Sequence, residues 1–121
     1  MAKKILVIDD DPVTVRCLQK SLQAQGYTVL SAFDGVQGLE TARSEKPDLI
    51  TLDVMMPNLN GYSVCGFLRA DAQLYTIPII MITSRQEEFD HSFDKDFAPD
   101  AYIIKPFSMK EVLDKVQALL C

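Results

Sequence analysis

Short aliphatic runs recur along the chain, and four of them end on polar residues. The runs and the polar residues that follow them are residues 5–8 before Asp9 and Asp10, 49–52 before Asp53, 79–82 before Thr83, and 102–104 before Lys105. Near-continuous Ile, Val and Leu are typical of strands buried on both faces, as in parallel sheets. Because parallel strands end at one edge, where open α/β sheets bind ligands, the pattern predicts a site there. That site would gather carboxylates, a hydroxyl and an ammonium group.

Segments with the helical spacing of apolar residues separate these runs. Helices are predicted over residues 12–25, 36–42, around 64–68, 85–97 and 109–120, and a weakly alternating strand over residues 27–33. Strand and helix therefore alternate five times. Because parallel strands need crossover connections, this alternation predicts an α/β fold with helices on both faces of a five-stranded parallel sheet.

The order of the strands does not follow from the pattern alone. The flavodoxin-like doubly wound order 2-1-3-4-5 places the first strand beside the third. That order would bring Asp9 and Asp10 next to Asp53, so we predict it for this chain. A chain of 121 residues suits a single core, and we expect one domain over residues 1–121.

The charge and hydropathy of the chain limit its partners. Twelve Lys and Arg against seventeen Asp and Glu give a formal net charge of −5, which argues against direct nucleic-acid binding by this domain. No apolar stretch approaches the ~20 residues that span a bilayer, and no signal peptide is recognisable. We therefore expect a cytoplasmic protein without a membrane partner.

Three acids at one edge would repel one another. Two unit charges ~4 Å apart interact by about 4 kcal/mol at an effective dielectric constant near 20, which raises the pKa of one carboxylate unless a cation compensates. Mg²⁺ binds one or two carboxylates and shares the oxygens of substrate phosphates. With Lys105 as a second positive charge and Thr83 as a hydroxyl donor, the predicted chemistry is phosphoryl transfer onto an aspartate.

Several segments resemble the receiver domain of response regulators, the phospho-acceptor half of two-component signalling. They are ILVIDDDP at residues 5–12, DLITLDVMMP at 48–57, Gly61, PIIMIT at 78–83 and YIIKPF at 102–107. They occur in order and cover essentially the whole chain. The resemblance implies a domain that takes a phosphoryl group from a sensor histidine kinase or a phosphotransfer protein. It would then switch conformation to control an output domain or a protein partner.

The resemblance also implies site residues. Asp53 would be phosphorylated and Lys105 would pair with the phosphoryl group. The ligands of Mg²⁺ would be Asp10, Asp53 and the backbone carbonyl of Met55, with Asp9 in support. Such a domain catalyses its own phosphorylation and slow dephosphorylation, and turns over no external substrate.

A conformational switch is implied as well. Thr83 would hydrogen-bond to the phosphoryl group, and Tyr102 would rotate inward to fill the space that Thr83 leaves. This movement would reshape the face built from residues 85–97, the last strand and the last helix. The peptide bond before Pro106 is cis in the family.

Two departures from the family pattern affect these expectations. Where the family often has Gly-Ala-Asp, this chain has Ala98-Pro99-Asp100, and Ala98 would fit poorly if that turn needs a positive φ. Met55 and Arg85 occupy the positions that tune the access of water to the acyl phosphate. A bulky Met55 there suggests slow self-hydrolysis.

Other functions remain open at this point. A flavodoxin-like electron carrier needs a phosphate-binding loop after the first strand, where this chain has three acids. A hydrolase of the haloacid dehalogenase type would use Asp9 and Asp11, but the chain has no room for the usual insertions. A receiver domain could be a stand-alone regulator or relay intermediate, or alternatively the N-terminal fragment of a longer DNA-binding transcriptional regulator. Homodimerisation is also left open.

Overall fold

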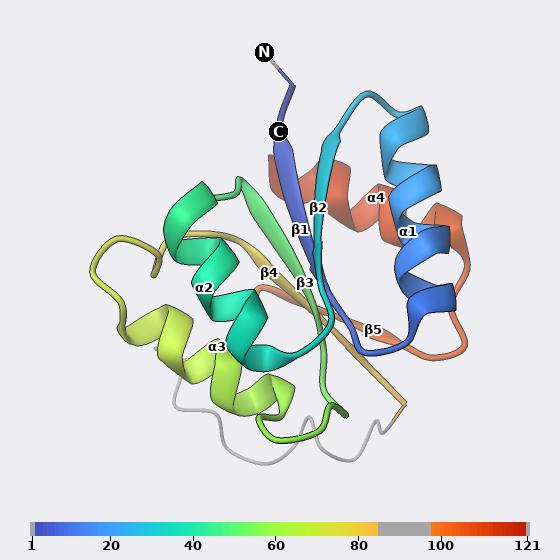
Figure 1. Ribbon diagram of the computed structural model, residues 1–121. Helices are drawn as coiled ribbons and strands as arrows, with labels where there is room; N and C mark the ends of the chain where they lie inside the picture. Colours follow the sequence, from blue (N-terminus) through green and yellow to red (C-terminus); the bar gives the residue numbers. More distant parts are fainter. Residues whose placement is uncertain (1, 85–97, 121) are drawn as a thin grey trace.

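Strands and helices alternate along the computed structural model, which describes residues 2–84 and 98–120 (Figure 1). The strands are β1 (Lys4–Ile8), β2 (Thr28–Ala32), β3 (Leu49–Asp53), β4 (Ile79–Thr83) and β5 (Ala101–Ile104). The helices are α1 (Pro12–Ala24), α2 (Gly35–Glu45), α3 (Gly61–Ala70) and α4 (Met109–Leu120). All five predicted strands and four of the predicted helices are confirmed. The helix expected over residues 85–97 lies outside the described residues.

The five strands form one parallel sheet in the order β2-β1-β3-β4-β5, as predicted. The register pairs Ile8 with Leu52 and Asp53 with Ile82, so the carboxyl ends of β1, β3 and β4 lie side by side. β3 therefore occupies the centre of the sheet. Residues that follow these strands reach one edge from distant parts of the sequence.

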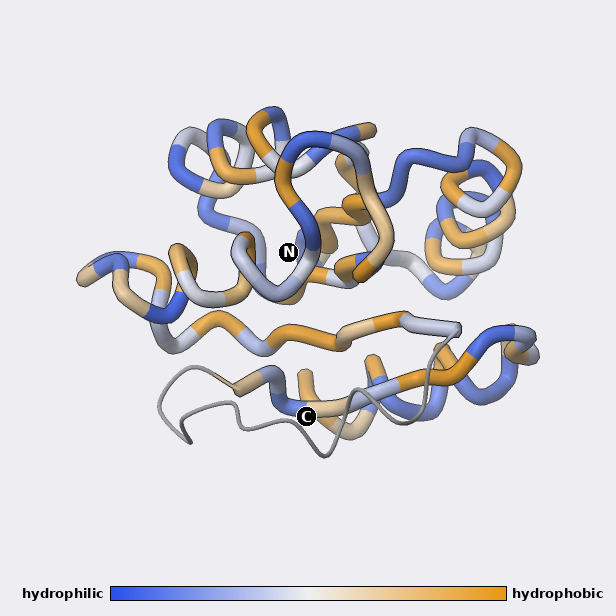
Figure 2. The backbone as a smooth tube through the Cα atoms, turned by 90° about the horizontal axis from the view of Figure 1, so that it is seen from below, coloured by the Kyte–Doolittle hydropathy of each residue, from blue (hydrophilic) through white to orange (hydrophobic). Residues whose placement is uncertain are grey.

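Two hydrophobic layers hold the sheet between its helices. Helices α1 and α4 cover one face, and α2 and α3 cover the other (Figure 1). Every residue of β3 and β4 is buried, which explains their continuous apolar sequences. β2 is an edge strand with a mixed burial pattern, in agreement with its weak alternation. In Figure 2 hydrophobic and hydrophilic residues alternate along the turns of each helix, because each helix buries a single stripe of side chains.

Side-chain caps fix where the helices begin. Asp11 caps α1, its carboxylate accepting hydrogen bonds from the Val13 N–H at 3.0 Å and the Thr14 hydroxyl at 2.9 Å. Pro12 follows in the first turn, where its missing N–H costs nothing. Lys46 follows α2 as its C-cap and adopts the left-handed conformation with φ 46°. Among the described residues, no helix is long and apolar enough to cross a membrane.

A buried guanidinium group organises the opposite edge of the sheet. The Arg69 side chain donates to the carbonyl oxygens of Ala98, Tyr75 and Ile77 at 2.8–3.0 Å, and to the Asp100 carboxylate at 2.6 Å. The same carboxylate oxygen accepts the Ile79 N–H at 2.8 Å. The φ angle of Ala98 depends on residue 97, which lies outside the described residues, so the expectation for this turn stays a prediction. Arg69 holds the chain entering β5 by the backbone carbonyl of Ala98.

Candidate functional site

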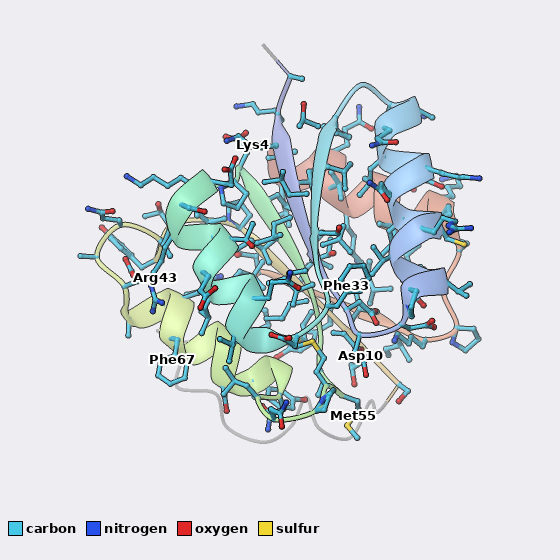
Figure 3. The ribbon with its side chains drawn as sticks, in the orientation of Figure 1. Lys4, Asp10, Phe33, Arg43, Met55 and Phe67 are labelled. Atoms are coloured by element: carbon cyan, nitrogen blue, oxygen red, sulfur yellow. The ribbon has the colours of Figure 1, made fainter. Side chains whose placement is uncertain are left out.

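The predicted convergence of acids is present at the carboxyl end of the sheet. Asp9 and Asp10 follow β1, and Asp53 ends β3. Their carboxylate oxygens lie within 4.8 Å of one another. Figure 3 shows Asp10 and Met55 at this end of the molecule, opposite Lys4 at the start of β1.

The three carboxylates differ in their exposure to solvent. Asp9 is 2% exposed and Asp53 is 4% exposed, whereas Asp10 is open to solvent. Asp9 Oδ1 accepts the Asp11 N–H at 2.9 Å. Asp9 Oδ2 has no hydrogen-bond partner among the described residues. The site is therefore a cluster of two buried carboxylates and one exposed carboxylate, here named the acidic pocket.

Lys105, which follows the edge strand β5, brings a positive charge to the acidic pocket. Its Nζ lies 3.1 Å from Asp53 Oδ1 and 3.7 Å from Asp9 Oδ2. The backbone N–H of Lys105 donates to the Thr83 carbonyl at 2.8 Å, continuing the ladder between β4 and β5. The Lys105–Pro106 peptide bond is cis, as the resemblance implied.

Burial affects the pKa values of Asp9 and Asp53 more than their ion pairs with Lys105 do. Burial raises the pKa of Asp53 to about 6, and the charge of Asp9 adds to this, while Lys105 opposes it. Burial also raises the pKa of Asp9. For Lys105, burial acts to lower the pKa, but the hydrogen bond and charge of Asp53 raise it on balance. A single ammonium group thus leaves the carboxylates under-compensated.

The donor set fits a hard divalent cation. Mg²⁺ prefers carboxylate, carbonyl and water oxygens, and the pocket offers three carboxylates with a buried oxygen on Asp9 that lacks a hydrogen bond. Met55 is 52% exposed and lies just beyond β3, at the same end of the molecule as Asp10. The residues present are therefore compatible with the magnesium site that the sequence predicts.

The two residues expected to switch lie on neighbouring strands. Thr83 ends β4 and is fully buried, one position beyond the Ile82 that pairs with Asp53. Tyr102 pairs with Met81 in the register of β4 and β5, and it packs partly buried against the cluster under α2 and α3. Arg85 and the remainder of the expected switching face, residues 85–97, lie outside the described residues.

The family of the chain follows from comparison with known proteins. The family model described as response regulator receiver domain matches residues 5–117. The chain belongs to this family. Its acidic pocket is therefore the pocket of a receiver domain of two-component response regulators. Neither an electron carrier nor a dehalogenase-type hydrolase is needed to explain it.

Relatives of this receiver domain include transcriptional regulators. The chain is 47% identical over 120 residues to the alkaline phosphatase synthesis transcriptional regulatory protein PhoP of Bacillus subtilis, covering 99% of the chain and 49% of PhoP. It is 42% identical over 120 residues to response regulator MprA of Mycobacterium ulcerans, covering 99% of the chain and 51% of MprA. The chain thus spans about half the length of these curated relatives.

Solved structures share the fold over nearly their whole length. The response regulator TrrA of Thermotoga maritima, in complex with Mg²⁺ and BeF, is 34% identical with a TM-score of 0.86, over 98% of this chain and 99% of that one. Chemotaxis protein CheY4 of Vibrio cholerae is 29% identical with a TM-score of 0.90, over 99% and 100% of the two chains. These TM-scores show that the chain shares its fold, including the strand order β2-β1-β3-β4-β5, with these response regulators.

A glycine holds the backbone of Asp53 in place. Gly61 begins α3, and its N–H donates to the Val54 carbonyl at 2.9 Å. A Cβ atom at Gly61 would overlap the carbonyl oxygen of Asp53 and crowd Val54. The close approach of α3 to the end of β3 therefore requires glycine at this position.

Substituting Gly61 by Ala is expected to destabilise the receiver domain by about 2 kcal/mol, because the added methyl group forces backbone rather than a side chain to move. Thermal or urea unfolding measures this loss. Gly66→Ala is the matched control, since a Cβ there meets no atom within 4 Å and alanine favours the helix. Equal stability of the two variants would contradict the packing described for Gly61.

Sequence reasoning missed one polar residue on the central strand. Thr51 lies in one of the apolar runs; the residue is 1% exposed, and its hydroxyl has no hydrogen-bond partner among the described residues. Its signal in the sequence is the single polar interruption of LITL before Asp53. Burying an unpaired hydroxyl is costly, so this position calls for an explanation.

Proposed function

We propose that this chain is a Mg²⁺-dependent phospho-acceptor in which Asp53 is the phosphorylated residue. An Asp53 carboxylate oxygen attacks the phosphorus of a phosphohistidine or a small acyl phosphate, and the bond from phosphorus to the donor breaks. The donor leaves as imidazole or carboxylate, and Asp53 becomes an acyl phosphate. The observation that carries the proposal is that the Asp53 carboxylate lies 3.1 Å from the Lys105 ammonium group and within 4.8 Å of two further carboxylates.

The metal belongs to the same proposal. Asp10 and Asp53 would bind Mg²⁺ directly, together with the backbone carbonyl of Met55, and Asp9 would support them. When bound, the ion supplies charge that stabilises the phosphoryl oxygens during transfer. TrrA was solved with Mg²⁺ and BeF, and a receiver domain from Pseudomonas aeruginosa was solved with a magnesium ion coordinated in its active-site cleft. These neighbours support the assignment.

Lys105 has two roles in this proposal. Its ammonium group keeps part of the Asp53 population ionised, which a nucleophilic carboxylate requires, and opposes the effect of burial on the Asp53 pKa. It is also 3.1 Å from the oxygen that would carry the phosphoryl group. A salt link from Lys105 to that group would replace the present one to Asp53 with little movement of the side chain.

The conformational response is proposed for Thr83 and Tyr102. Phosphorylation adds negative charge and several acceptor oxygens at the end of β3. The Thr83 hydroxyl can donate to one of them, and Tyr102 lies on the next strand where it can take up vacated space. A ligand shifts a two-state equilibrium only by its differential affinity, so the phosphoryl group must bind Thr83 better in the switched state.

The partners are proposed at the level of their class. A sensor histidine kinase or a phosphotransfer protein would supply the phosphoryl group to this domain, residues 1–121, in the cytoplasm. The signal would pass to a protein partner if the regulator acts alone or as a relay intermediate. The alternative, favoured by the likeness to PhoP, is an output domain that binds DNA. No external substrate would be turned over.

Mg²⁺ dependence tests the proposed function directly. Incubation with radiolabelled acetyl phosphate and Mg²⁺ is expected to label the protein with an acid-labile phosphoryl group, as expected of an acyl phosphate. EDTA is expected to reduce the rate by at least about 100-fold, because several kcal/mol of charge stabilisation are lost. Re-addition of excess Mg²⁺ is the control and should restore labelling. Undiminished labelling in EDTA would remove the metal from the mechanism.

A further inference from the structure

Two buried side-chain oxygens near the site have no hydrogen-bond partner among the described residues. They are Oδ2 of Asp9 and Oγ1 of Thr51, on residues 2% and 1% exposed. Buried polar atoms are nearly always paired in native proteins, with protein or with ordered water.

The sheet brings these two oxygens to the same face. The register pairs Val7 with Thr51 and Ile8 with Leu52, so Asp9 lies one strand away from Thr51 and two positions farther along. Val7 and Leu49 pack in the layer under α1 and α4. Because side chains alternate along a strand, Thr51 faces this layer too, directly below the acidic pocket.

The spacing suits a single bridging water. A strand rises ~3.3 Å per residue and neighbouring strands are ~4.8 Å apart, which puts the Cα atoms of Asp9 and Thr51 about 8 Å apart. The short Thr51 side chain does not close that distance with a direct bond. A water molecule that accepts the Thr51 O–H and donates to Asp9 Oδ2 would satisfy both atoms.

We propose that Thr51 is a positioning residue for Asp9, joined to its Oδ2 through one buried water. This inference rests on the proposed magnesium site, because Asp9 is assigned there as the supporting carboxylate. The bridge would hold the Asp9 carboxylate from below while Lys105 approaches the same oxygen at 3.7 Å. Partners of this kind, one step removed from the metal, commonly alter its affinity by 10–100-fold.

Thr51→Val tests the proposal, because valine keeps the shape of the side chain and removes the hydroxyl. We expect Mg²⁺, titrated calorimetrically, to bind the valine variant about tenfold more weakly than wild type. Thr51→Ser restores the hydroxyl and should bind within about threefold of wild type. Thr28→Val, at the exposed start of β2, controls for the same substitution in a strand.

The melting temperature of the metal-free protein provides a second readout. A bridged hydroxyl predicts that Thr51→Val lowers it by about 3–4 °C, since a satisfied polar group is lost. A hydroxyl without a partner predicts the opposite sign, because a buried methyl group is favourable in its place. Weaker Mg²⁺ binding with a lower melting temperature supports the proposal.

Three different results would overturn the positioning role of Thr51, the bridging water and the proposed function, respectively. Unchanged Mg²⁺ affinity in Thr51→Val overturns the positioning role, and an unchanged or raised melting temperature overturns the bridging water. If wild-type protein bound no Mg²⁺ and accepted no phosphoryl group, the proposed function would fail first. The sign of the change in melting temperature would still decide whether the bridge exists.

Discussion

Replacing Asp53 by Asn is expected to abolish phosphorylation by acetyl phosphate, with labelling at least 100-fold below wild type. The amide keeps the size of the side chain but offers no anionic oxygen to attack phosphorus. Asp9 and Asp10 remain in the pocket, but the Lys105 ammonium group lies 3.1 Å from Asp53, the carboxylate on the central strand. Phosphate incorporation followed by radiolabel or intact mass measures the effect.

Asp114→Asn is the matched control for this substitution. Asp114 is exposed on α4 and pairs with Lys110 at 2.8 Å, and it is not one of the three clustered acids. It should label at the wild-type rate. Full labelling of Asp53→Asn would show that another side chain accepts the phosphoryl group, and the assignment of Asp53 would be wrong.

The parts of the fold that sequence reasoning predicted have local causes. β3 and β4 are buried on both faces, so nearly all of their residues are apolar and the period of two disappears. Asp11 and Pro12 mark the start of α1 by capping and by ring geometry. The acidic pocket could be predicted as well, since parallel strands deliver their last residues to one edge.

The parts that sequence reasoning missed depend on contacts between distant segments. Arg69 bonds to residues 6–31 positions away, and no local pattern distinguishes it from a solvated arginine on a helix. The hydrogen bond to the Ala98 carbonyl likewise comes from a distant element, α3. Thr51 was overlooked because one hydroxyl does not alter the hydropathy of a strand.

Acidic pH is expected to stabilise the metal-free protein through Asp53. Burial raises the pKa of this carboxyl to about 6, whereas an unfolded aspartate has a pKa near 3.9. The folded state therefore binds the proton more tightly, and this contribution to stability is present below about pH 4. It is lost as the pH rises from about 4 to 6. The loss at pH 7 is on the order of 2–3 kcal/mol.

Comparison with Asp53→Asn isolates this effect, because the amide cannot ionise and the other groups remain. Urea unfolding in EDTA should show the two proteins within about 1 kcal/mol at pH 4, and the Asn variant more stable by about 2–3 kcal/mol at pH 7. Mg²⁺ should offset this difference for wild type, since 100 times its Kd adds about 2.7 kcal/mol. A difference between the proteins that does not change from pH 4 to 7 would mean that Asp53 ionises as freely as in solution. Burial disfavours the ionised form of Asp53, and a cation beside the carboxylate offsets that cost. The same measurement therefore tests the electrostatic basis of the magnesium site.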